Sequence, residues 1–182
     1  VTIQTTSQKS FKCTINVVKK ATKSTKIRLN KKTLNLKKGE SYDLVPTLTK
    51  KTSTDTIKWS SSNKKVAAVD AFGTVTGKKG GTVTITAKTS SGKKATCKVT
   101  IKVAAEKVKL TKTKLTIKKG AGTSLKAKLT PSDATDKQTW TTSNKKVVTV
   151  DKNGKIKGIK KGTATITVKA GGKKATCKIT VR

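Results

Sequence analysis

Histidine and methionine are absent from this chain of 182 residues, and proline, cysteine and aromatic residues are scarce. Without histidine the chain lacks both the usual acid–base group at neutral pH and the commonest metal ligand. Its eight acidic residues form no dense cluster of the kind that a calcium loop needs. They are Glu40, Asp43, Asp55, Asp70, Glu106, Asp133, Asp136 and Asp151. We therefore expect no catalytic residues, no metal ligands and no cofactor, and we do not expect an enzyme.

Long apolar runs are missing as well, because no stretch approaches the ~20 apolar residues that a membrane helix needs. A secretory leader is not visible either, since Val1 opens directly into alternating Thr and Ile. We expect no membrane span in this stretch, and we expect any targeting signal to lie outside it.

Lysine is what the sequence has in excess. Lysine and arginine together number 44 against eight acidic residues, and the formal net charge is +36. Only Arg28 and Arg182 are arginine. High charge with a hydrophobic fraction of 32% is a composition also found in disordered chains. The apolar residues alternate in short runs, however, and that pattern favours a folded β protein.

An internal repeat is the strongest signal in the sequence. Residues 59–66 read WSSSNKKV and residues 140–147 read WTTSNKKV, an offset of 81. Near the end, residues 95–101 match residues 175–181 at an offset of 80, so one residue is lost in the loop before the last strand. A third, partial copy opens the chain at residues 1–17. We therefore expect the parent protein to be longer than this sequence.

Within each repeat the apolar residues alternate with a period of two. Val83, Ile85 and Ala87 share one face of a predicted strand, whereas Thr84 and Thr86 share the other. Such alternation is typical of antiparallel strands with one buried and one exposed face, and the regular turn signals between the strands indicate a β-sandwich. We expect strands near 26–30, 33–37, 41–49, 56–61, 66–69, 73–77, 82–89 and 94–103, and the same set again in the second repeat.

Four motifs recur in the same order in both repeats. They are Leu34 to Gly39, Trp59 to Val66, Val69 to Gly77 and Gly81 to Thr86, with counterparts that begin at Leu115, Trp140, Val150 and Gly162. Together they resemble the bacterial immunoglobulin-like domains of group 2. The resemblance covers residues 26–182, and the first residues match the C-terminal end of the same pattern.

This resemblance implies an all-β fold of tandem immunoglobulin-like β-sandwiches. We expect complete modules at residues 25–103 and 105–182, and we expect residues 1–20 to be the C-terminal hairpin of a preceding, truncated module. The family occurs in bacterial surface adhesins, phage structural proteins and extracellular enzymes, so the resemblance implies a secreted or cell-surface location. The family has no catalytic residues to carry over, and the lysine content is where this sequence departs from it.

The three cysteines occupy one equivalent position in each copy of the repeat. Because Cys13, Cys97 and Cys177 fall one to a module, no disulfide can form within a module. Each lies on the inward face of its predicted strand beside Val or Ile, and no Cys-x-x-Cys spacing suggests a metal site. We expect three buried, unpaired thiols that pack as small apolar side chains.

Two repeated residue types look like sites but have structural explanations. Asp70 and Asp151 each open an Asp-x-x-Gly turn, in which the carboxylate accepts hydrogen bonds from the local backbone. Trp59 and Trp140 could stack on sugars, but an immunoglobulin-like sandwich places a tryptophan on its central strand. We favour the turn for the aspartates and the core for the tryptophans.

The lysines allow two interpretations. Lys-Lys-Gly occurs at residues 37–39, 78–80, 118–120 and 160–162, where the glycine closes a turn, so we expect these lysines at exposed tips. They form either a solvated surface that also protects sheet edges from aggregation, or a field that attracts polyanions. With two arginines, specific nucleic-acid recognition is not expected. Anionic wall polymers or host glycans fit an extracellular setting better.

The join between the modules, residues 102–107, contains neither glycine nor proline and therefore favours a semi-rigid connection. Three functions stay open at this point. The chain is a structural spacer or adhesin stalk, a polyanion- or glycan-binding module that acts through its lysines, or an accessory region of a larger enzyme. Its expected partners are neighbouring immunoglobulin-like modules and, in the second case, anionic polymers.

Overall fold

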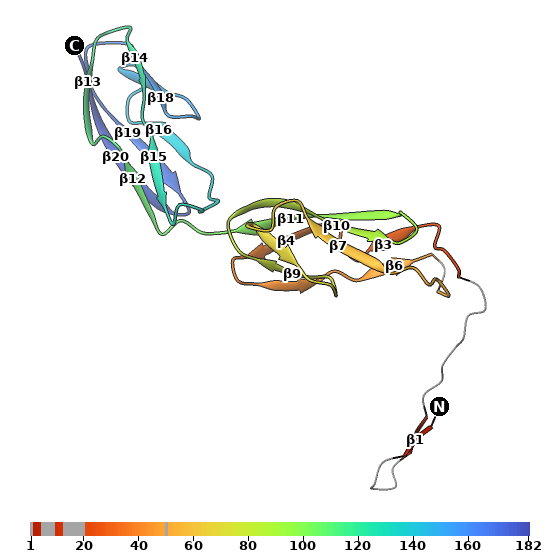
Figure 1. Ribbon diagram of the computed structural model, residues 1–182. Coiled ribbons are helices and arrows are strands. Elements are labelled where there is room, and N and C mark those ends of the chain that lie inside the picture. The colour runs from red at the N-terminus through yellow and green to blue at the C-terminus, as the bar shows by residue number, and fades with distance from the viewer. Residues whose placement is uncertain (1, 5–9, 13–20, 50) are drawn as a thin grey trace.

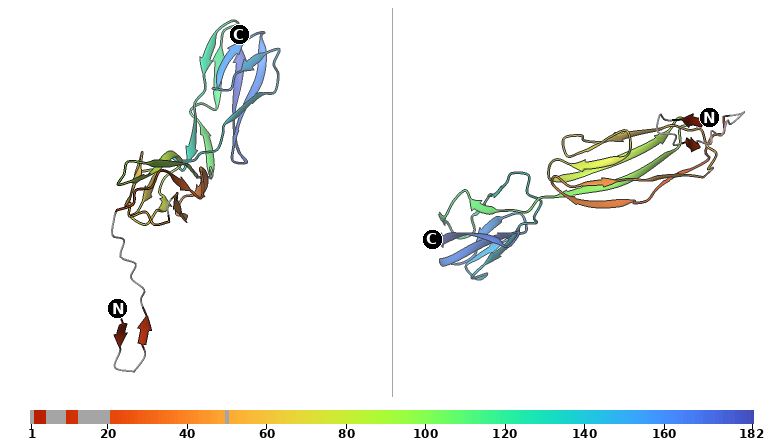
Figure 2. Two further views of the ribbon diagram at one scale, coloured as in Figure 1. Left: turned by 90° about the vertical axis from the view of Figure 1, so that its right-hand side faces the viewer. Right: turned by 90° about the horizontal axis from the view of Figure 1, so that it is seen from below.

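The structure is a computed structural model that describes residues 2–4, 10–12, 21–49 and 51–182. Strands, turns and loops make up these ranges, and within them no helix is long and apolar enough to cross a membrane. Figure 1 shows two β-sandwich modules that follow one another along the chain, and Figure 2 shows that a single extended segment connects them. The predicted all-β fold of tandem sandwiches is therefore confirmed.

The first module has two layers. One layer is a four-stranded sheet with the order β4-β11-β10-β7, and the other combines the sheet β5-β9-β8 with the pair β3-β6. The strands are β3 (Ile27–Leu29), β4 (Thr33–Lys37), β5 (Ser41–Asp43), β6 (Pro46–Leu48), β7 (Ile57–Ser61), β8 (Ala67–Val69), β9 (Thr74–Gly77), β10 (Gly81–Thr89) and β11 (Lys94–Lys102).

The second module repeats this topology. Its layers are the sheet β13-β20-β19-β16 and, opposite, the sheet β14-β18-β17 with the pair β12-β15. The strands are β12 (Lys107–Leu110), β13 (Lys114–Ile117), β14 (Gly122–Ser124), β15 (Ala127–Thr130), β16 (Thr139–Thr142), β17 (Val148–Val150), β18 (Lys155–Gly158), β19 (Gly162–Ala170) and β20 (Lys173–Val181). The repeat in the sequence is thus a repeat of structure.

Before the first module, β1 (Thr2–Gln4) pairs antiparallel with β2 (Ser10–Lys12). The remaining positions of the predicted N-terminal hairpin lie outside the described residues. That residues 1–20 belong to a preceding module stays a prediction.

The long hairpin of each module supplies most of its core. In β10 and β11, Ile85 lies opposite Cys97 and Val83 lies opposite Val99, and all four side chains are buried. Their neighbours along each strand, threonine and lysine, point to the other face. Burying a Val or Ile side chain contributes ~1.5–3 kcal/mol. The two-residue period seen in the sequence therefore marks the side chains whose burial stabilises each module.

One predicted strand is wrong. The expected strand at residues 41–49 is two strands, because β5 pairs with β9 whereas β6 pairs with β3. The chain leaves the first partner at Leu44, whose amide donates to the carbonyl of Gly73 at 3.0 Å. It joins the second at Val45, whose amide donates to the side-chain oxygen of Asn30 at 3.0 Å. The alternation of apolar residues continues through this change of partner, so the sequence period does not reveal it.

The first strand of each module also changes layers. β3 pairs with β6 in one layer, whereas β4 runs parallel to β11 in the other. Residues 30–32 make the crossing, and the Lys98 amide of β11 donates to the Lys32 carbonyl at 2.9 Å. β4 accompanies β11 only from Lys98 onward, and β3 flanks the earlier part of β11.

The two cores predict two separable unfolding transitions. Ile85 and Ile166 are matching core residues, and each is fully buried. We expect Ile85→Ala to destabilise the first module and Ile166→Ala the second, each by ~2–5 kcal/mol. Differential scanning calorimetry of the full chain should show one transition moving in each variant. A single transition that both substitutions shift equally would contradict two independent cores.

Candidate functional site

The residues that the sequence singled out as possible chemistry occupy structural positions. Cys97 and Cys177 are free, fully buried thiols, and burial raises the pKa of each. The prediction is confirmed for these two, and Cys13 lies outside the described residues. Within the described part of the chain no three or more Cys, Asp or Glu side chains are grouped so that they could hold a metal ion.

The Asp-x-x-Gly turns pack against the tryptophans. Oδ1 of Asp70 accepts from the Phe72 and Thr74 amides, both at 2.9 Å, and these bonds, the one from Thr74 foremost, lower the pKa of Asp70. Gly73, at φ +95°, lies against Trp59, and a Cβ there would come within 2.6 Å of the indole ring. Trp59 is half-buried and packs against the core.

The second module has the same arrangement. Asp151 accepts from the Asn153 and Lys155 amides at 2.8 and 2.9 Å, and the bond from Lys155 contributes most to lowering its pKa. Trp140 is half-buried against its core, with Gly154 beneath the ring. The predicted turn role of the aspartates is confirmed, and the tryptophans lie at the margin of the core and not in its centre.

A pair of aspartates that the sequence analysis did not single out fixes the segment leading into each module. We call residues 22–24 and 103–105 the leading segments. The Ser24 amide donates to Oδ2 of Asp55 at 2.7 Å, and at the matching place the Ala105 amide donates to Oδ2 of Asp136. We call this bond the carboxylate anchor. Asp55 and Asp136 are related by the offset of 81, so the signal was present in the sequence.

A neighbouring threonine reinforces each anchor. The Thr54 amide donates to the Thr22 carbonyl at 3.0 Å, and the Thr135 amide donates to the Val103 carbonyl at 2.8 Å. In the second module the Val103 amide also donates to Oγ1 of Thr135 at 3.0 Å. Each leading segment is therefore held by backbone and side-chain bonds to the loop before the strand that carries the tryptophan, β7 in the first module and β16 in the second.

Asp55 carries further bonds. It accepts from the hydroxyl groups of Ser53, Ser90 and Ser91 and from the Ser91 amide, at 2.9–3.0 Å. The Ser24 amide is the largest of the effects that hold the pKa of Asp55 far below its ordinary value, and the serine bonds add to it. The carboxylate thus ties the leading segment to the tip of the β10–β11 hairpin.

The two modules meet at one acidic side chain. Asp133, in the loop between β15 and β16, accepts from the Gly80 amide at 3.2 Å and pairs with the Lys38 ammonium at 3.3 Å. Its side chain is 7% exposed, whereas that of Lys38 is 52% exposed. The Gly80 amide is the largest influence that lowers the pKa of Asp133. We call these bonds the inter-module contact. Two of the predicted exposed Lys-Lys-Gly tips therefore form part of the joint.

Gly80 makes this contact possible. A Cβ at position 80 would overlap the carbonyl oxygen of Asp133. The matching positions of the other module are Lys161 for Gly80 and Thr52 for Asp133. Gly80 and Asp133 are therefore not repeated in the other module, so the sequence repeat gives no signal for this contact.

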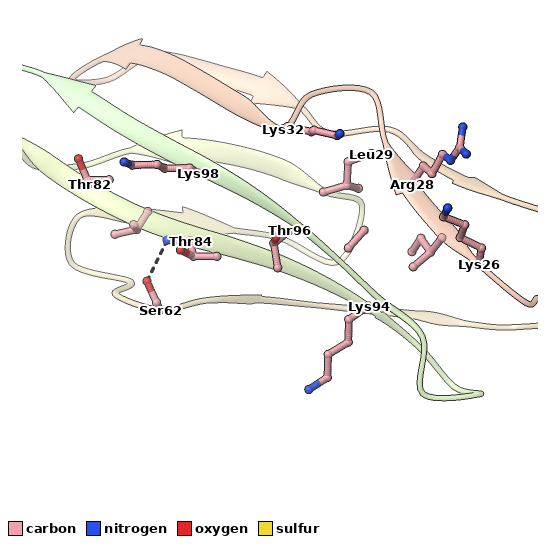
Figure 3. A pocket seen from close by; sticks show the side chains of 13 residues that line it. Lys26, Arg28, Leu29, Lys32, Ser62, Thr82, Thr84, Lys94, Thr96 and Lys98 are labelled. Carbon is pink, nitrogen blue, oxygen red and sulfur yellow. Dashed lines mark hydrogen bonds between the residues drawn. The ribbon is translucent and has the colours of Figure 1, made fainter.

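A basic groove lies on the first module where β3 flanks β11. It encloses about 790 Å³, and its lining includes Lys26, Arg28, Lys32, Lys94 and Lys98. In the view of Figure 3, Lys98 lies toward Thr82 at one end, and Arg28 and Lys26 lie at the other. The side chains that line it include threonines and a serine but no acidic residue.

The comparison with known families settles what kind of module this is. The family described as bacterial Ig-like domain (group 2) matches residues 23–99 and again residues 104–179. The chain belongs to this family. It is a tandem pair of bacterial Ig-like domains, as the motif resemblance implied.

Related bacterial Ig-like segments occur within much longer proteins. An uncharacterized protein of Clostridium acetobutylicum is 42% identical over 61% of this chain and 12% of its own length. Lacto-N-biosidase of Bifidobacterium bifidum is 47% identical over 37% of this chain and 6% of its own length. Kappa-carrageenase of Pseudoalteromonas carrageenovora is 42% identical over 43% of this chain and 20% of its own length. The chain thus spans a fifth or less of these relatives.

The solved structures that this chain matches include domains 4 and 5 of the S-layer protein SbsC. That structure is 20% identical, with a TM-score of 0.41, and the match covers 88% of this chain and 99% of that one. The N-terminal four Ig domains of Dscam1 are 13% identical with a TM-score of 0.48, over 88% of this chain and 47% of that one.

The carboxylate anchor of the first bacterial Ig-like domain predicts a pH dependence. Folding depresses the pKa of Asp55, so the ionised carboxylate stabilises the folded domain above the unfolded pKa of ~3.9. This stabilisation is lost as the pH falls through the pKa of the folded state. We expect Asp55→Asn to destabilise the first domain at pH 7 and the difference from the unmodified chain to shrink steadily below about pH 4.

The measurement is urea unfolding of the full chain between pH 2 and pH 7. Asp43→Asn is the matched control, because it removes the same charge from an exposed acid of the same domain. A difference between Asp55→Asn and the unmodified chain that stays constant over this range would contradict the anchor.

Proposed function

We propose that this pair of bacterial Ig-like domains, residues 25–103 and 105–182, is a non-catalytic spacer in a bacterial surface or secreted protein, where it holds neighbouring parts of the parent chain at a set separation and orientation. The observation that carries this proposal is the inter-module contact. A flexible linker would leave the two domains free to rotate, whereas here a buried carboxylate of one domain bonds to the backbone of the other.

The length of the connection supports the same function. Only residues 103–106 separate β11 from β12, and Val103 and Ala105 are both hydrogen-bonded to the second domain. The last strand of one domain therefore leads into the next through a segment that is already fixed. A short, bonded connection transmits orientation, which is what a spacer requires.

The relatives support an extracellular setting and explain why an enzyme association also arises. Two of them are named as a lacto-N-biosidase and a kappa-carrageenase, and the matched segments are 6% and 20% of their lengths. Segments this short within named enzymes fit accessory modules next to a catalytic part. An accessory region of a larger enzyme is thus one place in which the spacer would act, with the catalytic residues elsewhere in the parent chain.

A second candidate function, polyanion binding, rests on how the acidic residues are used. Six of the eight accept backbone amide hydrogen bonds, and in the described part of the chain Lys38–Asp133 is the one salt bridge. The six are Glu40, Asp55, Asp70, Asp133, Asp136 and Asp151. The acids therefore leave almost all of the lysine charge without an internal counterion. A field of one sign attracts anionic polymers such as wall polymers or glycans.

The spacer function predicts that the relative orientation of the domains depends on Gly80 and Asp133. Gly80→Lys introduces the residue found at the matching place in the second domain, and its Cβ would displace the Asp133 carbonyl. The backbone at position 80 is not in the left-handed region, so the first domain should keep its own stability. We expect loss of the fixed orientation while both domains stay folded.

The measurement is residual dipolar couplings on the full chain. In the unmodified chain one alignment tensor should fit both domains. In Gly80→Lys, and more weakly in Asp133→Asn, the two domains should require separate tensors. Asp43→Asn controls for the loss of one negative charge. Separate tensors in the unmodified chain would refute the spacer proposal.

A further inference from the structure

We propose that the basic groove of the first domain is a binding site for an acidic linear polysaccharide, one that carries sulfate or carboxylate groups. This inference names a site for the second candidate function and rests on it. The groove is distinct from the inter-module contact, because none of its lining residues takes part in that contact. The lining comes from Lys26 and β3, from Lys32 in the crossing, from Ser62 after β7, and from β10 and β11.

The change of layers by the first strand creates the groove. β3 stands beside β11 without pairing to it, and the crossing delivers Lys32 to the edge of the same surface. The outward residues Thr82 and Thr84 of β10 and Thr96 of β11 form the floor. Figure 3 shows Ser62 bonded to the backbone amide of Thr84, at 3.0 Å, at the border of this floor. The result is a row of hydroxyl groups with cations at its margins.

The cations of the groove are available to a ligand. Lys26, Arg28, Lys32, Lys94 and Lys98 are all exposed. Within the described residues none of these side chains has a hydrogen-bond or salt-bridge partner. Their charges are therefore balanced by solvent ions, which a bound polyanion would release.

One end of the groove adjoins a line of like charges. Lys88 of β10 lies opposite Lys58 of β7 on one side and opposite Lys94 of β11 on the other. All three are exposed, whereas their neighbours within the same strands are buried or half-buried, so the three lysines share the outer face. Like charges directly opposite in a sheet destabilise it. An anionic chain laid across the three strands would relieve this repulsion, so the folded domain gains from binding it.

The lining favours an acidic sugar polymer over other ligands. No aromatic side chain lines the groove, and such a surface has nothing on which nucleic-acid bases or the faces of neutral sugars could stack. The threonine and serine hydroxyls can instead exchange hydrogen bonds with sugar hydroxyls. Arg28 offers the paired N–H groups that match a sulfate or carboxylate, and elsewhere lysine provides single charges.

The second domain provides an internal comparison. The positions that match Arg28, Lys94 and Lys98 are Lys109, Lys174 and Lys178, and the position that matches Lys32 is Thr113. The second surface therefore has no guanidinium group and one cation fewer. We expect the first domain to bind more tightly than the second.

The test uses the full chain and a fluorescent heparin dodecasaccharide, with an oligogalacturonate as the carboxylated probe and duplex DNA and dextran as comparators. The groove variant is Arg28→Gln, Lys94→Gln, Lys98→Gln. The matched control is Lys109→Gln, Lys174→Gln, Lys178→Gln, which removes the same charge. We expect the groove variant to bind heparin at least ~10-fold more weakly, with a salt dependence reduced by ~2–3 counterions, and the control to lose less than ~3-fold.

A third variant tests the contribution of the hydroxyl groups separately from that of the positive charges. Thr82→Val with Thr84→Val keeps every cation, and we expect it to weaken heparin binding about 3- to 10-fold through the lost hydroxyl hydrogen bonds. Preference for heparin or for the oligogalacturonate identifies sulfate or carboxylate as the favoured group. Circular dichroism confirms that each variant is folded.

Three outcomes would overturn the proposal. Equal loss in the groove variant and its matched control would leave only diffuse attraction, so polyanion binding would stand without this site. Duplex DNA binding as tightly as heparin, with the same dependence on the groove, would overturn the ligand class. No binding by the unmodified chain even at low salt would remove both the site and the second candidate function.

Discussion

The bond between an aspartate and the amide of the leading segment is the constraint on which the other features depend. Asp55 holds residue 24, and this fixes where β3 starts and therefore where the wall of the basic groove stands. Asp136 holds residue 105, and this fixes the direction in which the second domain leaves the first. A carboxylate suits this task because it accepts several amide and hydroxyl bonds at once and makes charge-assisted hydrogen bonds, which are stronger than neutral ones.

The scarcity of acidic residues becomes intelligible in the same terms. A surface acid beside a lysine contributes little, because exposed ion pairs are screened and cost side-chain entropy. An acid that accepts backbone amides at a turn or a joint fixes the path of the chain. Glu40, Asp55, Asp70 and Asp151 serve turns or loops, whereas Asp133 and Asp136 serve the joint. The lysines can then be numerous because the folded chain does not rely on them for internal pairs.

The sequence predicted what repeats and what alternates. The offset of 81 and the two-residue period predicted the two sandwiches, the buried Cys97 and Cys177, and the turns at Asp70 and Asp151. The split of residues 41–49 escaped because the period runs on through a change of partner. The carboxylate anchors were detectable at the repeat offset but look like ordinary loop residues, because their partner amides lie 31 positions away.

The sequence predicted a semi-rigid connection between the domains but not the inter-module contact of Asp133, and the reason bears on how tandem domains avoid pairing wrongly. Two domains this similar could dock in either order if their ends matched. Asp133 stands where the first domain has Thr52, and Gly80 stands where the second has Lys161. If the second domain preceded the first, Lys161 would take the place of Gly80 and Thr52 the place of Asp133. The lysine side chain would not fit, because even a Cβ at this place overlaps the facing backbone. The contact thus distinguishes one order from the other because its two halves depart from the repeat. The residues that the two domains share specify the common fold, and the differences at Gly80 and Asp133 specify how the folded domains are joined.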